Sequence, residues 1–240
     1  KLSLLRHNST TTHLLFEDGT AIDHRVVIGA DGVNSRVRDF VATPMRPRPT
    51  NQMCWRGVLE YALPSDVQNQ SYEAWHNGIR FGYVQINSRE VYWYFVCLKE
   101  HRITTETIAE SLLNFFPLAK KIVELTSHSN IFQSVLADIK PFKNWSRGNS
   151  CLIGDAAHAT TPNLGQGACQ AIEDAYLLGN LLIKHSTLTA LQLFPKLRQN
   201  RVNSIVNTSR QIGWISHWQQ TTSQTLRNAS MRLVPSWATL

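Results

Sequence analysis

The chain has 240 residues, of which 42% are hydrophobic and 17% are charged, and its formal net charge is +7. A chain of this length and composition can bury a substantial core, which excludes disordered, collagen-like and disulfide-scaffold proteins. The longest strongly apolar run, 91–98, is far shorter than the roughly 20 residues that span a bilayer. The N-terminus also lacks the pattern of a signal peptide, so no membrane-spanning segment is predicted.

The excess of Lys and Arg is spread along the chain without a basic stripe interleaved with aromatic residues, which argues against nucleic acid as a partner. The four cysteines lie far apart and form no C-x-x-C pair, so the sequence predicts neither a zinc site nor a disulfide framework. We therefore expect no metal and a reducing, cytoplasmic compartment. Because the chain begins at Lys1 without an initiator Met, we expect a fragment or a processed product.

Strand signals come first along the chain. Leu2–Leu5 and His13–Phe16 are predicted to pair, with a tight turn at Asp18-Gly19. The segment 25–30 is a short β-branched run that leads into Gly29-Ala30-Asp31-Gly32, which is typical of a buried strand entering a loop. A ligand site can lie at the carboxyl end of such a strand.

The middle of the chain reads as a sheet followed by helices. Three prolines within 44–49 are expected to interrupt regular structure. Four strands of a mostly antiparallel sheet are then predicted at 54–63, 71–76, 80–86 and 91–99. Apolar spacing predicts a helix over 105–116, ended by Pro117, and a second one over 118–126. The residues that set the first spacing are Ile108, Leu112, Leu113 and Phe116. These helices should cover one face of the sheet.

A second apolar strand, Cys151–Ile153, ends in Gly154-Asp155, and a helix is predicted to open near Gly167 after a Gly-rich loop. The spacing of its apolar residues predicts a single buried face: Ala168, Ala171, Ile172, Ala175, Leu178 and Leu182. A further helix is predicted over 188–210 despite Pro195. The remainder to Leu240 is polar and only loosely periodic.

The strongest chemical signal is Gly154-Asp155-Ala156-Ala157-His158 followed by Pro162-Asn163-Leu164-Gly165-Gln166-Gly167. The Asp155 carboxylate can accept hydrogen bonds from sugar-like hydroxyl groups. Gly165 and Gly167 let the backbone approach a flat ligand closely. The helix N-terminus after Gly167 favours a ligand atom that gains negative charge. A purely structural turn has little use for this series of residues, so a polar ligand site is predicted.

These residues resemble the second FAD fingerprint of the FAD-dependent aromatic monooxygenase family, which has the p-hydroxybenzoate hydroxylase fold. From Pro162 to Ala175 the match is similar to the branch of zeaxanthin epoxidases, salicylate hydroxylases and urate hydroxylases. Val27–Gly32, with Ser35 and Arg38, resembles the Asp-Gly motif of the same family, which is associated with FAD and the nicotinamide cofactor. The resemblance implies that the cofactor-binding residues are Asp31, Gly32, Arg38, Gly154, Asp155, Pro162, Gly165, Gln166 and Gly167.

The implied fold is α/β, mixed α+β: a Rossmann-like FAD/NAD(P)-binding remnant with an inserted, mostly antiparallel substrate-domain sheet and C-terminal helices. The family begins with a βαβ unit whose G-x-G-x-x-G loop holds the FAD pyrophosphate. No such motif occurs in these 240 residues, so the sequence resembles the C-terminal part of the family. The predicted division is FAD-binding in 1–43 and 149–186, substrate-domain sheet with covering helices in 44–148, and a C-terminal helical region in 187–240.

The implied activity is monooxygenation: NADH or NADPH reduces FAD, and O₂ supplies the oxygen that hydroxylates or epoxidises a small aromatic or alkene substrate. Because the cofactor carries the chemistry, no acid-base pair is required of the protein, and the catalytic residues stay unknown. Arg56 and Tyr83 are candidates for facing the substrate, and His158 is expected to orient its turn. Two alternatives stay open, namely a truncated non-catalytic flavoprotein homologue and a flavin-dependent reductase of related fold.

Overall fold

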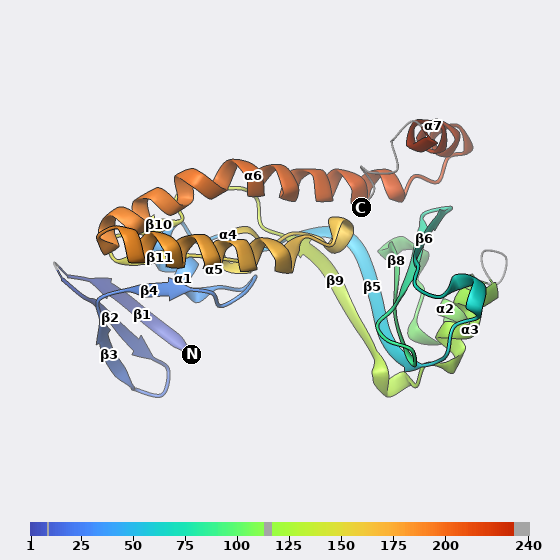
Figure 1. Cartoon of the computed structure of the whole chain (residues 1–240), viewed down its shortest axis with the longest axis horizontal. Helices are drawn as coiled ribbons and strands as arrows, with labels where there is room; N and C mark the ends of the chain where they lie inside the picture. The colour runs from blue at the N-terminus through green and yellow to red at the C-terminus, as the bar shows by residue number, and fades with distance from the viewer. Residues whose placement is uncertain (9, 113–116, 233–240) are drawn as a thin grey trace. The chain divides into compact units, whose positions relative to one another are not determined.

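The computed structural model describes residues 1–8, 10–112 and 117–232, and the chain divides into two compact units (Figure 1). Unit 1 consists of Lys1–Pro49 and Ala137–Ile212, and unit 2 consists of Thr50–Leu136 and Gly213–Leu240. Each unit is described by itself. The division of the sequence into FAD-binding and substrate domains stays a prediction.

Unit 1 contains an antiparallel three-stranded sheet in the order β1-β2-β3. Strands β1 (Leu2–His7) and β2 (Thr12–Phe16) confirm the predicted pair. Gly19 has φ +85° and donates its N–H to Phe16 O at 3.0 Å, which forms the predicted turn. Strand β3 (Ala21–His24) was not predicted, because all four of its residues are exposed and it therefore lacks an apolar pattern.

A second sheet of unit 1 has the order β10-β11-β4. Strand β4 (Val27–Gly29) runs parallel to β11 (Ser150–Leu152), and β10 (Ser146–Arg147) pairs antiparallel with β11. Parallel pairing brings the carboxyl ends of β4 and β11 to the same edge of the sheet. The loops that carry Asp31-Gly32 and Gly154-Asp155 therefore start side by side.

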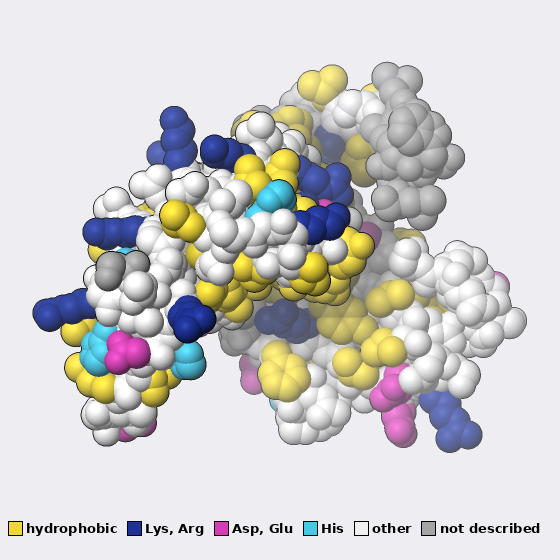
Figure 2. Space-filling model, turned by 60° about the vertical axis from the view of Figure 1, so that its left-hand side comes forward, with side chains coloured by type: hydrophobic (Ala, Val, Ile, Leu, Met, Phe, Trp, Pro, Cys, Tyr) yellow, Lys and Arg dark blue, Asp and Glu magenta, His cyan; other side chains and the backbone are white. Residues whose placement is uncertain are grey.

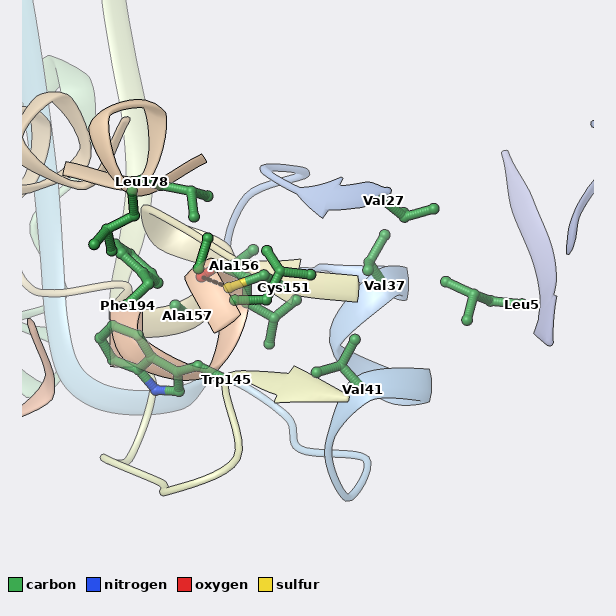
Figure 3. Close-up of a cluster of buried hydrophobic side chains, with 14 of the residues drawn as sticks. Leu5, Val27, Val37, Val41, Trp145, Cys151, Ala156, Ala157, Leu178 and Phe194 are labelled. Atoms are coloured by element: carbon green, nitrogen blue, oxygen red, sulfur yellow. Dashed lines mark hydrogen bonds between the residues drawn. The ribbon is translucent and has the colours of Figure 1, made fainter. Parts of the chain in front are cut away.

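The helices of unit 1 enclose an apolar core around these two strands. They are α1 (Arg36–Val41), α4 (Asp155–His158), α5 (Gly167–Lys184) and α6 (Thr187–Ser216). Figure 3 shows core side chains from β4, α1, β11, α4, α5 and α6 converging on one another, among them Val27, Val37, Cys151, Ala156, Leu178 and Phe194. Helix α1 was not predicted, because six residues are too few to show a periodicity. Helix α6 continues through Pro195, as expected.

The face that α5 buries differs from the predicted one. Ile172 is 69% exposed, and Ala168 and Ala175 are also exposed. The buried residues of the helix are Gln170, Asp174, Leu178 and Leu181. Only Leu178 of these belongs to the predicted set. The physical reason is that Gln170 and Asp174 find buried polar partners, so hydrophobic periodicity does not identify the inward face.

Unit 2 is built on a five-stranded sheet in the order β6-β7-β8-β5-β9. The pairings β6–β7, β7–β8 and β8–β5 are antiparallel, which confirms the predicted mostly antiparallel sheet. One face is covered by α2 and α3, where Ile108, Ile122 and Leu112, which directly follows α2, pack with Trp55 and Trp93. The elements are β5 (Arg48–Glu60), β6 (Ser71–His76), β7 (Ile79–Gln85), β8 (Glu90–Leu98), β9 (Ile131–Asp138), α2 (Ile108–Ser111), α3 (Pro117–Leu125) and α7 (Thr221–Arg232).

Two predictions about prolines in this region were wrong. Strand β5 begins at Arg48 and includes Pro49, because a proline is tolerated near the first residue of a strand. Pro117 begins α3 instead of ending a helix, since its fixed φ suits the first helical position. The helix predicted over 105–116 consists of a 3-10 turn (Thr105–Thr107) and α2, and Leu113 and Phe116 lie outside the described residues. Strand β9 and helix α7 were not predicted.

Further 3-10 turns lie at Ser65–Val67, Lys99–His101, His128–Asn130 and Pro162–Leu164. None of the helices in the described residues carries an apolar stretch long enough to cross a bilayer. Figure 2 shows Lys and Arg side chains scattered over the displayed face, not gathered into one stripe.

Candidate functional site

Arg38 connects the two motif loops of unit 1. Its side chain is almost fully buried, with Nη2 donating to Val33 O at 2.8 Å and Nη1 donating to Ala156 O at 3.1 Å. The first carbonyl belongs to the loop after β4, and the second belongs to α4. Arg38 was predicted to bind the cofactor, and the structure places its guanidinium on backbone carbonyls of both loops. Arg38 therefore holds the backbone of both loops in place.

Asp31 occupies the N-terminus of α1. Its Oδ1 accepts a hydrogen bond from Ser35 Oγ at 2.5 Å, and its Oδ2 accepts from the N–H groups of Arg36 and Val37 at 2.7 and 3.2 Å. Gly32, which follows, has φ +79° and open space where a Cβ would stand. The carboxylate is thus committed to capping the helix, while the backbone at Gly32 stays accessible to a ligand.

The turn after β11 presents Asp155 to solvent. Gly154 has φ +56°, and its N–H donates to Asp174 Oδ2 at 2.9 Å. A Cβ on Gly154 would lie 3.2 Å from the Cβ of Ala171, so this turn packs directly against the first turns of α5. Asp155 begins α4, is exposed, and has no hydrogen bond or ion pair to another described residue. Its carboxylate is free to accept hydrogen bonds from a ligand.

His158, at the end of α4, is buried and faces inward. Its Nε2 lies 2.6 Å from Asp174 Oδ2, and its ring lies 5.3 Å from the ring of Trp145. The side chain therefore fixes α4 against α5 and the core. This geometry agrees with the expected role of orienting the turn.

Asp174 is the centre of the polar network under this site, and sequence reasoning gave it no role. It is fully buried and also accepts a hydrogen bond from Arg198 Nε at 2.7 Å. Burial alone would raise the pKa of Asp174, but the hydrogen bonds from His158, the Gly154 N–H and Arg198 outweigh it and lower the pKa. The carboxylate therefore remains ionised and holds three segments of unit 1 together.

Arg198 extends the network from α6 to the first turns of α5. Its Nη1 donates to Glu173 Oε2 at 2.6 Å, and its Nη2 donates to Gln170 Oε1 at 2.7 Å. The available sequence signal was the pair Glu173-Asp174 inside an apolar helix, followed by an Arg in the next helix. Such a signal does not show which carboxylate faces inward.

The loop before α5 is fixed to α6 by Ser209. Ser209 Oγ donates to Thr161 O at 2.7 Å, and Asn163 Nδ2 donates to Ser209 O at 2.8 Å. Pro162 begins the 3-10 turn, and Gly165 ends it with φ +65°. The backbone from Thr161 to Gly165 is therefore held in one conformation by residues distant in sequence.

Helix α5 begins at Gly167 with its N-terminus uncapped. Gln166, the N-cap residue, makes no side-chain cap, and the first turn holds no acidic residue. The N–H groups of the first turn point out of the helix without an intrahelical acceptor and carry its positive dipole end. A Cβ on Gly167 would meet Thr160 Cγ2 at 3.5 Å, an ordinary contact, so the chain itself does not require glycine here. The open space suits a ligand that lies against the backbone.

These features fit the flavin half of FAD. An unpartnered carboxylate suits the ribityl hydroxyls, and an uncapped helix N-terminus suits the ring edge that becomes anionic on reduction. Across residues 1–8, 10–112 and 117–232, no group of three or more His, Cys, Asp or Glu side chains is arranged to hold a metal ion. The cofactor-binding residues named from the sequence stay predictions, and the geometry suits most of them.

The two weak substrate candidates lie on opposite faces of the sheet in unit 2. Arg56 is paired across the strands with Tyr94, whereas Tyr83 is paired with Trp93, and paired residues share a face. Tyr83 is buried under the covering helices and stacks on Tyr72, with ring centroids 5.6 Å apart. Burial raises the pKa of Tyr83. Tyr83 therefore belongs to the core of unit 2.

Arg56 lines a cavity of about 500 Å³ on the other face. Val58, Tyr92 and Phe132 contribute apolar walls, and no described residue forms a hydrogen bond or ion pair with the Arg56 side chain. Farther along this face, Glu73 accepts a hydrogen bond from Arg80 at 2.7 Å and another from Tyr94 Oη. Of the two candidates, only Arg56 is placed to meet a ligand.

Comparisons with known proteins identify relatives that bind FAD or are named as monooxygenases. The family model described as "FAD binding domain" matches residues 5–194. The 2-heptyl-3-hydroxy-4(1H)-quinolone synthase of Pseudomonas aeruginosa is 36% identical over 229 residues, covering 91% of this chain and 59% of that protein. The aurachin C monooxygenase/isomerase of Stigmatella aurantiaca is 32% identical, covering 91% of this chain and 58% of that protein.

Among solved structures, Klebsiella pneumoniae HpxO complexed with FAD and uric acid matches with a TM-score of 0.85 and 25% identity, covering 98% of this chain and 62% of that one. The chain thus spans about three fifths of the length of the relatives it matches. The family model covers well over half of the chain, including both motif loops. Its fold is also that of HpxO complexed with FAD. Because the family model matches most of its residues, the chain belongs to the FAD-binding-domain family.

Proposed function

We propose that the protein is an FAD-dependent monooxygenase that uses NADH or NADPH and O₂ to hydroxylate or epoxidise a small electron-rich substrate. The observation that carries this proposal is the exposed, unpartnered Asp155 in a turn packed against the uncapped start of α5. With FAD bound, Asp155 would accept hydrogen bonds from the ribityl hydroxyls, and the free N–H groups after Gln166 would stabilise negative charge on the reduced flavin. The family match supports the same assignment.

When bound, FAD would accept a hydride from NAD(P)H and activate O₂. The residues of this chain bind and orient it. Asp174, Arg198 and Ser209 are buried and hydrogen-bonded to other protein groups, so they act as positioning residues that fix the Gly154 turn and the Thr161–Gly165 loop. A site held by buried hydrogen bonds on rigid elements keeps its donors aimed at the ligand without further rearrangement.

The substrate proposal rests on the cavity beside Arg56. Apolar walls from Tyr92 and Phe132 suit a flat ring, and the guanidinium suits a ring oxygen that carries partial negative charge. One relative is named for a 3-hydroxy-4(1H)-quinolone product, and another is an aurachin C monooxygenase/isomerase. A 4-quinolone-type ring, whose carbonyl oxygen accepts a hydrogen bond from Arg56, is therefore our narrower proposal.

Oxygen uptake with a quinolone probe tests this function. The purified protein, supplied with FAD in large excess, NADH or NADPH, and 2-heptyl-4(1H)-quinolone, should consume O₂ and give a product heavier by one oxygen atom. Arg56→Gln should weaken probe binding about tenfold, since a hydrogen bond to a charged group is lost. Tyr83→Phe, which keeps the buried ring stack, is the matched control and should bind the probe normally.

Other outcomes would favour the alternatives. A colourless protein that gains no flavin on addition of FAD supports a non-catalytic homologue. Flavin reduction with a reduced product and no substrate-dependent O₂ uptake supports a reductase. A cytoplasmic location remains part of the proposal and is supported by the four cysteines, all of which are free thiols in the structure.

A further inference from the structure

A second buried carboxylate of unit 1 holds two arginines, and these three residues are together called the Asp138 cluster. Asp138 ends β9, and its side chain has no exposed surface. It accepts hydrogen bonds from Arg48 Nε at 2.8 Å, Arg48 Nη2 at 2.9 Å and Arg210 Nη1 at 3.1 Å. Arg48 begins β5, and Arg210 lies on α6. Hydrogen bonds between ionised groups are strong and directional, so the cluster fixes three segments that are distant in sequence.

One side of the Asp138 cluster adjoins residues 159–165, between α4 and α5, which are called the flavin loop. Ile139 follows Asp138 directly, and its N–H donates to Ala159 O at 2.9 Å, at the first residue of the loop. Ile139 is 1% exposed, so this hydrogen bond is shielded from water. Because the two residues share a peptide unit, fixing Asp138 on its arginines also fixes the N–H to which the loop is bonded.

The other side of the cluster adjoins the middle of the flavin loop. Ser209 precedes Arg210 on α6, its Oγ donates to Thr161 O at 2.7 Å, and its carbonyl oxygen accepts from Asn163 Nδ2 at 2.8 Å. The ion pair of Arg210 therefore holds the turn of α6 that carries these contacts. The flavin loop is thus fastened at two places, and each place is next in sequence to a member of the cluster.

The cluster also lies where the chain passes between the two units. The crossings are at Pro49–Thr50, Leu136–Ala137 and Ile212–Gly213. Each member of the cluster belongs to unit 1 and lies within a few residues of a different crossing. The ion pairs therefore keep the three crossing segments at a fixed spacing inside unit 1. The flavin loop takes its position from two of these segments.

We propose that the Asp138 cluster positions the flavin loop for FAD. Arg48 and Arg210 hold Asp138, and the adjoining backbone holds the loop that leads into the uncapped start of α5. The three residues are positioning residues, because they act through the backbone and not through contact with the cofactor. Loss of one arginine leaves a buried carboxylate with fewer partners and loosens the loop. The inference rests on the proposed function, since it concerns the same flavin site.

Hydrogen exchange and a flavin titration together test the proposal. In Arg210→Gln, backbone amides of 159–165 should exchange about fivefold faster, because opening this segment becomes easier, while those of β6 and β7 should keep their rates. The dissociation constant for FAD should rise about fivefold, because the loop is less well preorganised. Arg48→Gln should have the same two effects, since it removes the other arginine. Arg210→Lys keeps a charged donor towards Asp138 and should restore most of both properties.

Lys120→Gln is the matched control. Lys120 pairs with Glu124 on α3, and its side chain is 33% exposed, against 34% for Arg210. This variant should leave loop exchange and FAD binding unchanged. Urea unfolding checks that each variant is folded, and a general loss of stability would also speed exchange in β6 and β7.

The proposal is overturned if folded Arg48→Gln and Arg210→Gln proteins match the Lys120→Gln protein in loop exchange or in FAD affinity. An unmodified protein that binds FAD no better than these variants overturns this proposal alone. An unmodified protein that takes up no FAD overturns both this proposal and the proposed function.

Discussion

At the scale of single residues, one buried carboxylate organises the candidate flavin site. Asp174, on α5, receives hydrogen bonds from the Gly154 N–H and His158 at the two ends of α4 and from Arg198 on α6. A buried ion pair with its hydrogen bonds satisfied is tolerated, but removing one partner leaves the other charge uncompensated. The integrity of the turn that carries Asp155 therefore depends on a residue that is fully buried beneath it.

Asp174→Asn should lower the free energy of unfolding by about 1.5 to 3 kcal/mol, because the hydrogen bonds from Arg198, His158 and the Gly154 N–H lose their charged acceptor, while Arg198 keeps its ion pair with Glu173. The measurement is urea unfolding followed by circular dichroism. Asp23→Asn is the control, since Asp23 pairs with His13 at the exposed surface and should cost less than about 1 kcal/mol. Equal stability of the two variants would show that the Asp174 network does not hold the structure together.

His217 should make stability depend on pH. The pKa of His217 is lowered from 6.5 to about 4, chiefly by burial and also by the nearby charges of Arg80 and His101, while the hydrogen bond to the Gly213 carbonyl acts in the opposite direction. Between about pH 6.5 and pH 4, His217 binds a proton in the unfolded chain but not in the folded chain. The contribution of His217 to stability is therefore complete above about pH 6.5 and decreases as the pH falls towards 4. Between pH 7 and pH 5 the loss should be about 2 kcal/mol.

His217→Gln cannot titrate in this range and should remove that part of the pH dependence. Urea unfolding of both proteins at pH 7 and pH 5 checks this. If the variant loses as much stability as the unmodified protein between the two pH values, other groups cause the loss.

At the scale of elements, α5 has a polar buried face at its beginning and an apolar exposed face along its length. The exposed residues include Ile172, Tyr176 and Ile183, at 69%, 76% and 84% exposure. Its uncapped N-terminus is the part assigned to the flavin. A helix N-terminus stabilises nearby negative charge by about 0.3 to 2 kcal/mol, depending on burial.

Gly167→Val should make the flavin harder to reduce. The protein itself has room for the added Cβ, but the branched side chain occupies the space where a ring would meet the backbone. The flavin reduction potential should become more negative, and reduction by NAD(P)H should become slower, with the fold unchanged by circular dichroism. Gly179→Val places the same change at an open position of the same helix and should leave the potential unchanged. Equal potentials in both flavin-bound variants would place the cofactor elsewhere.

Elements with a strong local signal were predictable, and the others depend on contacts that the sequence does not show. Strand β6 matches its prediction residue for residue, and β7 and β8 are shifted by one residue, because aromatic and β-branched runs mark them. Strand β9 has no regular alternation, with Phe132 and Val135 exposed. The two motif loops could be predicted from the sequence, because their glycines and Asp155 mark them. The inward orientation of Asp174 could not be predicted, because it depends on an ion pair with Arg198 on another helix.

At the scale of the whole molecule, two observations concern what the 240 residues can do by themselves. They contain no G-x-G-x-x-G loop, which in dinucleotide-binding folds holds the pyrophosphate. They also expose the apolar stripe of α5, formed by Ile172, Tyr176 and Ile183. Exposed apolar patches promote association.

Expressed as they stand, these 240 residues should bind FAD weakly and self-associate. Analytical ultracentrifugation should show species larger than a monomer, and Ile172→Glu/Tyr176→Glu should shift the protein towards monomer by placing charge on the stripe. Glu substitutions at Asn207 and Gln211, which are exposed polar residues of α6 with the same spacing, provide the control. A stable monomer with stoichiometric FAD would contradict this prediction, because it would show that these residues bind FAD tightly without a G-x-G-x-x-G loop.

The central claim is that the turn after β11 binds FAD through the Asp155 carboxylate, and a flavin titration of Asp155→Ala tests it most directly. Loss of the acceptor leaves ribityl hydroxyls unpaired, which should cost about 1 to 3 kcal/mol, or about 5- to 150-fold in the dissociation constant. Asp23→Ala, at an exposed position on β3, should bind FAD normally. A correctly folded Asp155→Ala protein that binds FAD as tightly as the Asp23→Ala protein would contradict the assignment.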